Sequence, residues 1–110
     1  MRGKPGIGTG VMKLLEGATS TAEGPRVDLD FAYSNWALQV VGASTDLAVV
    51  LRGGLASSSD ATLTTIATWS STDGSGATVF ASGKPASVVS ATITGGASSG
   101  GASAWAAGAP

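Results

Sequence analysis

Apolar and polar residues alternate along much of the chain, in runs short enough to be β-strands. Successive side chains of a strand point to opposite faces, so a period of two predicts a strand with one buried face. Residues 34–53, "SNWALQVVGASTDLAVVLRG", hold two such runs around a turn at 42–46. We predict that they form a β-hairpin. Its inward face, the rigid centre of the core, comprises Trp36, Leu38, Val40, Leu47, Val49 and Leu51.

Further strands are predicted at 27–32, 62–69, 78–81, 88–94 and 102–107, separated by glycine-rich turns. Residues 62–69 depart from strict alternation. A β-bulge between Leu63 and Ile66 would restore the alternation. The same spacing fits a helix, but the threonines in this segment disfavour one. Residues 11–15 fit either a strand or one helical turn.

Seven or eight short, evenly spaced strands predict an all-β fold, either an antiparallel β-sandwich or a small jelly-roll-like barrel. The 110 residues correspond to one domain. Residues 1–10 hold four glycines and a proline, a composition that is costly to order. Four of the six basic residues, Arg2, Lys4, Lys13 and Arg26, precede Val27. We therefore divide the chain into a flexible N-terminal arm and loop at 1–26 and a β-sandwich domain at 27–110.

The composition excludes much of the common chemistry of enzymes. The chain has no Cys and no His, so it lacks a thiolate nucleophile, a disulfide, the usual zinc ligands and a Ser-His-Asp triad. Charged residues make up 12%, about half of the usual ~25%. We expect no enzymatic activity, no cofactor and no metal. No apolar run approaches the ~20 residues of a membrane span, and we see no signal peptide, so we expect synthesis in the cytoplasm and no membrane partner.

A few residues remain as candidates for chemistry or binding. Asp28 and Asp30 share one face of a strand, as in some cation or glycosidase sites, although the alternation already explains them as solvated side chains. Trp36 and Trp105 lie within apolar strand patterns and are predicted to be in the core. Tyr33 and Trp69 lie near strand ends and are better candidates for an interface. The basic arm is too weak a signal to predict a nucleic-acid partner.

The order "WALQV…VVLRGGL…TLTTIATW…GATVFASGKPASVVSATITG…SAWAAG" resembles a group of small all-β virion proteins of tailed bacteriophages, the capsid decoration (cement) proteins. The resemblance covers about residues 27–107. It includes a "V-F-x-x-G-K-P" turn and a strand that ends in "A-T-I-T-G". Residues 53–69 depart from the "G-S-L-D-G-x-x-W" run that the resemblance implies there.

The resemblance implies a mechanical role on the exterior of the virion. Decoration proteins bind the major capsid protein on the outer surface of the capsid, commonly as homotrimers, and bridge neighbouring capsomers. The residues that we expect to make these contacts are Arg2, Lys4, Ile7, Met12, Leu14, Leu15 and Trp69. The alternative is a carbohydrate- or receptor-binding β-sandwich module of a phage tail or capsid, which would use Trp69, Tyr33 and aspartates in turns.

Overall fold

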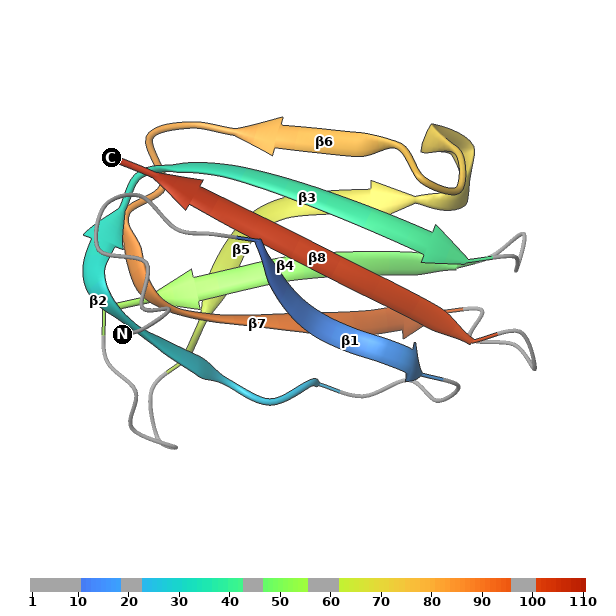
Figure 1. Cartoon of the computed structure of the whole chain (residues 1–110), viewed down its shortest axis with the longest axis horizontal. Helices are drawn as coiled ribbons and strands as arrows, with labels where there is room; N and C mark the ends of the chain where they lie inside the picture. The colour runs from blue at the N-terminus through green and yellow to red at the C-terminus, as the bar shows by residue number, and fades with distance from the viewer. Residues whose placement is uncertain (1–10, 19–22, 43–46, 56–61, 96–100) are drawn as a thin grey trace.

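A computed structural model of the chain describes residues 11–18, 23–42, 47–55, 62–95 and 101–110. Within these residues, eight strands form two four-stranded antiparallel sheets (Figure 1), and no helix is long and apolar enough to cross a membrane. The elements are β1 (Met12–Ala18), β2 (Val27–Tyr33), β3 (Asn35–Gly42), β4 (Ala48–Gly54), β5 (Thr64–Ser70), the 3-10 turn η1 (Ser71–Asp73), β6 (Thr78–Ala81), β7 (Ala86–Gly95) and β8 (Ala102–Ala109).

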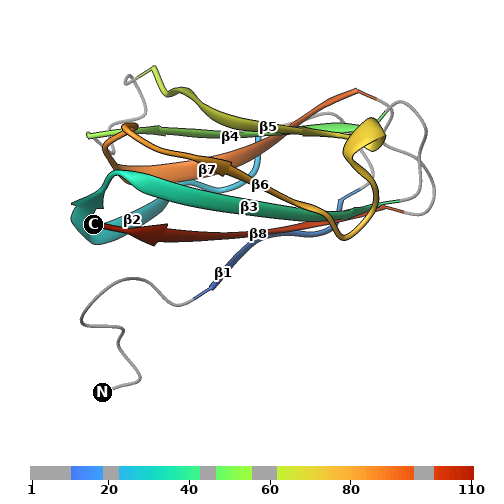
Figure 2. The same ribbon diagram turned by 90° about the horizontal axis from the view of Figure 1, so that it is seen from above.

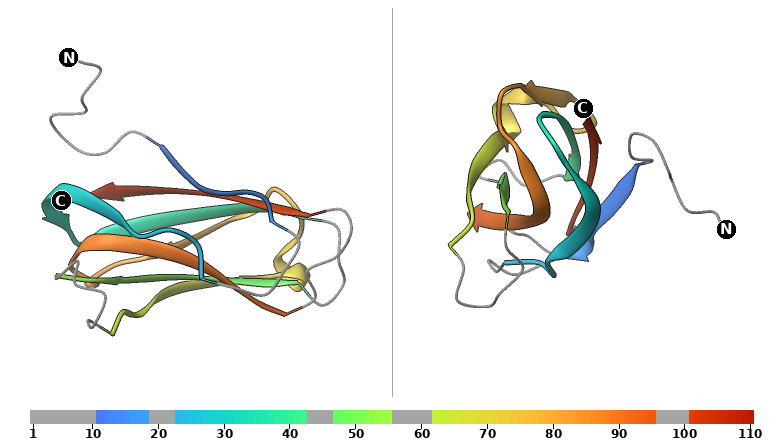
Figure 3. Two further views of the ribbon diagram at one scale, coloured as in Figure 1. Left: turned by 90° about the horizontal axis from the view of Figure 1, so that it is seen from below. Right: turned by 90° about the vertical axis from the view of Figure 1, so that its left-hand side faces the viewer.

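The strand order shows how the chain is rolled up. The first sheet has the order β1-β8-β3-β6 and the second sheet has the order β2-β7-β4-β5. Each strand of the first half therefore pairs with its counterpart in the second half: β1 with β8, β2 with β7, β3 with β6 and β4 with β5. The chain is one long antiparallel hairpin rolled into two layers, which Figures 2 and 3 show edge-on. This is the order of an eight-stranded jelly roll, so the predicted all-β sandwich is confirmed.

The core lies between the two sheets and contains the six predicted inward residues. Leu38, Val40, Val49 and Leu51 have no exposed surface, while Leu47 and Trp36 are 1% and 2% exposed. Alternation along β3 and β4 therefore identified the buried face correctly. Each Leu or Val that is buried in this way contributes about 1.5–3 kcal/mol relative to an exposed side chain.

The predicted hairpin at 34–53 is wrong, because β3 and β4 belong to different sheets. β3 pairs with β6 and β8, and β4 pairs with β5 and β7. The chain thus passes from one layer to the other between these two strands. A hairpin and such a crossover bury the same alternate residues, so the pattern could not separate them. The turn at 43–46 lies outside the described residues.

The predicted β-bulge in the threonine-rich strand is present, and the helix is absent there. In the ladder between β4 and β5, Leu51 faces Ala67 and the next residue, Arg52, faces Thr65. Ile66 is the extra residue, so the bulge lies between Thr65 and Ala67 rather than directly after Leu63. The register shift allows Ile66 and Trp69 to enter the same core, at 6% and 0% exposure.

The segment that precedes residue 27 is not wholly an arm, and the predicted boundary after residue 26 is corrected. Residues 12–18 form β1, which pairs with β8 in the first sheet. A register shift between Lys13 and Leu15 turns two successive side chains inward, and Leu14 and Leu15 are 3% and 9% exposed. The sandwich therefore includes β1.

Candidate functional site: the outer face of the first sheet

The aspartates whose side chains the structure describes do not form a reactive cluster. Asp28 is exposed on β2, and Asp73 accepts a 2.9 Å hydrogen bond from the Ser70 amide at the start of η1. Its role there is to cap a turn, which is a common use of aspartate. In the part of the chain that the structure describes, no group of three or more His, Cys, Asp or Glu side chains could hold a metal ion. Asp60 lies outside that part, and the side chain of Asp30 is not described.

Three of the predicted contact residues are part of the protein's own core. Leu14 and Leu15 pack between the sheets, and Trp69 is fully buried. The indole Nε1 of Trp69 donates a 3.1 Å hydrogen bond to the Gly74 carbonyl, which satisfies its polar atom inside the fold. These side chains are not available to a partner, which corrects the prediction. Met12 is half-buried against the same core. Arg2, Lys4 and Ile7 lie outside the described residues.

Tyr33 is also buried, so the predicted sugar platform of Tyr33 and Trp69 does not exist. Tyr33 is 4% exposed and packs edge-to-face on Trp36, with 6.3 Å between the ring centroids. Trp36 lies in the core as predicted. Its Nε1 donates to the carbonyls of Tyr33, at 3.1 Å, and Lys84, at 3.0 Å. This pair closes one end of the sandwich.

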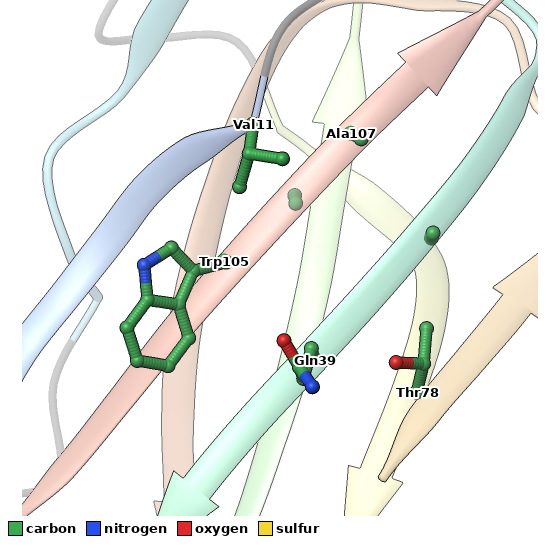
Figure 4. A pocket seen from close by; sticks show the side chains of 7 residues that line it. Val11, Gln39, Thr78, Trp105 and Ala107 are labelled. Atoms are coloured by element: carbon green, nitrogen blue, oxygen red, sulfur yellow. The ribbon is translucent and has the colours of Figure 1, made fainter. Parts of the chain in front are cut away.

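Trp105 is a third aromatic residue that the sequence misplaced, after Trp69 and Tyr33. It was predicted to be in the core, but it lies on the outer face of the first sheet (Figure 4), while Ala104 and Ala106 point inward. The Lys13 ammonium lies 5.3 Å from the centroid of the indole ring, within cation–π range. The flanking residues are all small or apolar, so "SAWAAG" carries no polar alternation that would show which face is outside.

The registers arrange this outer face in rows that cross the strands. One row contains Lys13, Trp105, Gln39 and Thr78, one residue from each strand. In the next row, Ala107 faces Ala37, and Ala37 faces Phe80. Met12 faces Ala106, so Val11, just before β1, lies level with Ala107. The second row thus has a large apolar side chain at each end and two alanines between them.

The two alanines form the floor of a shallow trough. They line two adjoining hollows of about 170 and 260 Å³. A third hollow of about 300 Å³ shares Asn35, Trp36 and Phe80 with the second and extends the trough to Ser82. The Trp105 row forms one wall, as Figure 4 shows for Trp105, Gln39 and Thr78. Phe80 stands at the far end, where Asn35 and Ser82 continue the lining. The trough exists because alanine leaves only a methyl group above the sheet, whereas its neighbours are larger.

This face is apolar and almost uncharged. Phe80, Val11 and Val41 are 78%, 71% and 44% exposed, and the register places Val41 on the same face of β3 as Ala37. The four strands of the first sheet hold only two charged residues, Lys13 and Glu16, whose side chains form an ion pair at 3.6 Å. Exposed apolar surface of this kind marks interaction sites on proteins.

Hydrogen bonds to the backbone hold the polar rim of the trough in place. Gln39 donates from Nε2 to the Gly76 carbonyl at 2.8 Å, and Asn35 donates from Nδ2 to the Pro110 carbonyl at 2.7 Å. The face is therefore largely preorganised, which lowers the entropy lost on binding. The outer face of the second sheet differs, because it exposes Thr64, Thr65 and Thr68 of β5 and Asp28 of β2.

Comparison of the chain with protein-family models, with curated proteins and with solved structures finds no match in any of the three.

Proposed function

We propose that the protein is a structural virion protein that binds the outer surface of a phage capsid and stabilises the lattice by bridging capsomers. The observation that carries the proposal is the outer face of the first sheet, a rigid, apolar and nearly uncharged surface centred on the trough. The resemblance of residues 27–107 to capsid decoration proteins supports it. The proposal includes that the protein acts by contact with its partners and not by catalysis.

The physical properties of this face suit a protein that is packed densely on a lattice. Its low charge limits repulsion between neighbouring copies. Each contact can be modest, because many copies on one lattice bind with high avidity. The proposed partners are the major capsid protein and other copies of this chain in a homotrimer, on the exterior of the virion. We propose no cofactor, no nucleic-acid partner and no membrane partner.

The structure changes the residues that we assign to the contact. Phe80, Trp105 and Val11 replace Leu14, Leu15 and Trp69, because the first three have surface to offer and the last three are buried. Arg2, Lys4 and Ile7 remain in the proposal as part of the N-terminal segment, which joins the first sheet at Val11 beside the trough.

Two phenylalanines provide a matched test. Phe80 and Phe31 are both exposed, at 78% and 59%, but Phe31 belongs to β2 of the second sheet. We expect wild-type protein to co-sediment with capsids that lack it, in a stoichiometric, lattice-like copy number. Phe80→Ser should weaken binding by about tenfold or more, which is common for an interface anchor, and Phe31→Ser should not. No wild-type binding, or equal loss in both variants, would overturn the proposal.

Deletion of residues 1–10 tests how much the N-terminal segment contributes to capsid binding. The expected result is weaker capsid binding by a protein that keeps its β-sheet circular dichroism spectrum. If the truncated protein binds as well as the full chain, then Arg2, Lys4 and Ile7 are not contacts.

A second candidate function is carbohydrate binding. Trp105 takes the place of Trp69 in this candidate, because Trp69 is buried. The half-buried indole of Trp105 leaves part of its surface open on the outer face for stacking, and Gln39 and Thr78 beside it can form hydrogen bonds with hydroxyl groups. A glycan array with wild-type protein and Trp105→Ala separates the two functions. A glycan signal that disappears in the variant would support this candidate, and the absence of any signal would reject it.

A further inference from the structure

β6 is the least protected of the strands that end the two sheets. These edge strands are β1 and β6 in the first sheet and β2 and β5 in the second (Figure 1). Register shifts interrupt the ladders of β1, β2 and β5, and β1 and β2 also carry charged residues. Bulges and charges of this kind hinder the addition of a further strand to an edge. β6 reads "TVFA", with an unbroken register and neither a charge nor a proline, so only its short length protects it.

The register shows which backbone groups of β6 point away from the sheet. In an antiparallel strand, the N–H and C=O of one residue point to one neighbouring strand, and those of the next residue point to the other side. The Val40 carbonyl of β3 accepts a 2.7 Å hydrogen bond from the turn that precedes β6, so it points toward β6. Leu38, two residues earlier, points the same way and faces Val79. Val79 therefore bonds to β3, and Thr78 and Phe80 direct their N–H and C=O groups outward.

These outward groups are open to a partner. Within the part of the chain that the structure describes, no backbone hydrogen bond joins them to another segment. Both residues are exposed, Phe80 by 78%. Donors and acceptors that are aligned at strand spacing are complementary to another extended backbone. A strand that adds to such an edge gains affinity from main-chain hydrogen bonds and specificity from the side chains beside them.

The outer face next to this edge determines which partner it suits. The four-residue edge, ~13 Å long and one strand spacing of ~4.8 Å wide, covers only about 60 Å² of sheet, whereas each partner of a stable interface buries about 800 Å². A second copy that paired only along β6 would therefore bind weakly. Phe80 belongs both to β6 and to the trough, so a partner that covers the outer face also reaches the edge.

We propose that the capsid partner contributes an extended segment that adds to β6 as a fifth strand of the first sheet. This inference rests on the proposed function and specifies the form of its partner. The segment exchanges main-chain hydrogen bonds with Thr78 and Phe80 and places an apolar side chain beside the Phe80 ring, as in other cross-strand pairs. Phe80 thus remains a contact residue, with its ring on the outer face and its backbone in the new ladder.

Hydrogen exchange in the bound state tests the inference. Isotope-labelled protein, free or on capsids, is placed in D2O, then dissolved in an aprotic solvent and measured by NMR. In the free protein, the Thr78 and Phe80 amides should exchange faster than the Val79 amide, which bonds to β3. On capsids, exchange at Thr78 and Phe80 should slow by about tenfold or more. The amides of β5, at the edge of the second sheet, are the control and should exchange equally in both states.

The outcomes separate the inference from the proposed function. Capsid binding without added protection at Thr78 and Phe80 would overturn the inference alone, because side chains would then make the contact. Slow exchange of both amides in the free protein would also overturn it, since the edge would already be paired. The absence of capsid binding would overturn the proposed function, and the inference with it.

A matched pair of variants isolates one outward hydrogen bond. Thr78→Pro removes the amide hydrogen at the first residue of β6, a position where an edge strand accepts proline. Thr78→Val removes the same hydroxyl but keeps the amide. Thr78→Pro should bind capsids about threefold to tenfold more weakly than Thr78→Val, which corresponds to one hydrogen bond. Equal affinities of the two folded variants would overturn the inference. If the proline variant loses its β-sheet circular dichroism spectrum, the exchange measurement decides alone.

Discussion

The three tryptophans show how much the burial of a single side chain depends on its neighbours. Trp36 and Trp69 are buried, and the Nε1 atom of each donates to backbone carbonyls. Trp105 is in an equally apolar stretch but lies outside, next to Lys13. Its strand is so rich in alanine that the core side is filled by Ala104 and Ala106. The residue type alone therefore did not determine whether the indole is in the core or on the surface.

Leu51→Ala tests the core at its centre. Leu51 has no exposed surface, so removing its side chain should leave a cavity and lower the free energy of unfolding by about 2–5 kcal/mol. Val41→Ala is the control, since Val41 is 44% exposed on the outer face, and should change stability by about 0.5 kcal/mol or less. Urea unfolding followed by circular dichroism measures both. A cost near zero for Leu51→Ala would contradict the core assignment.

Gly53→Ala tests the packing beside the bulge. A Cβ at Gly53 would lie 2.5 Å from Ile66 Cδ1 and 2.7 Å from Ala86 Cβ, so the sheets would have to shift. Overpacking of this kind costs about 1–3 kcal/mol. At the next residue, Gly54, the nearest atom would be the flexible Leu63 Cδ2 at 3.3 Å. Thermal unfolding should show a lower midpoint for Gly53→Ala than for Gly54→Ala; the reverse order would refute the close contact.

At the scale of elements, β1 is where the sequence and the structure differ most. Its composition continues that of a glycine-rich, basic N-terminal region, and its apolar residues break strict alternation. The register shift against β8 resolves both points, because it turns Leu14 and Leu15 inward together. A bulge in one strand depends on the strand beside it, so the local pattern could not specify it. The element is a strand of the sandwich and carries two core leucines.

Leu14→Ala tests whether β1 is part of the fold. The variant should lose about 2–5 kcal/mol of stability, because Leu14 is 3% exposed in the main core. Glu16→Ala, in the same strand but with a side chain that is 79% exposed, is the matched control and should have little effect. Chemical denaturation distinguishes them. If both variants match the wild type, residues 12–18 belong to an arm after all.

At the scale of the whole molecule, the pairing of first-half with second-half strands brings the described contact residues Val11, Phe80 and Trp105 to one face. Val11, Phe80 and Trp105 are far apart in the sequence, yet they line one trough because β1, β6 and β8 share a sheet. The rigid sandwich supplies the shape, and the absence of charge from most of that face determines the kind of binding it favours.

Binding through this face should depend little on salt. Its two charged residues are already paired with each other, so few ions are exchanged when apolar surface is buried. We expect the capsid affinity to change by less than about threefold between 50 and 300 mM NaCl, a range over which contacts dominated by exposed charges weaken much more. Titration at the two salt concentrations measures this. A steep loss of affinity with salt would indicate that Arg2 and Lys4, rather than the trough, dominate binding.

Sequence patterns predicted most of the fold but little of the candidate site. Strand positions and the bulge near Ile66 followed from alternation, which is local. The candidate site could not be predicted from local patterns, because it depends on which side of β8 faces the core and on which strand lies next to Ala37. Nothing in the sequence around Phe80 and Val11 indicated that these two side chains would be exposed.

By itself, the sequence determined that the chain forms short strands, which face of β3 and β4 supplies the core, and that the usual catalytic groups His and Cys are absent. These properties depend on residues within a few positions of each other. Only the tertiary structure decided that β3 and β4 lie in opposite sheets, that β1 completes the first sheet, and that Trp105 lies outside while Trp69 lies inside. The physical reason is that alternation specifies a buried face without specifying its partner, and the partner is chosen by how all eight strands pack together.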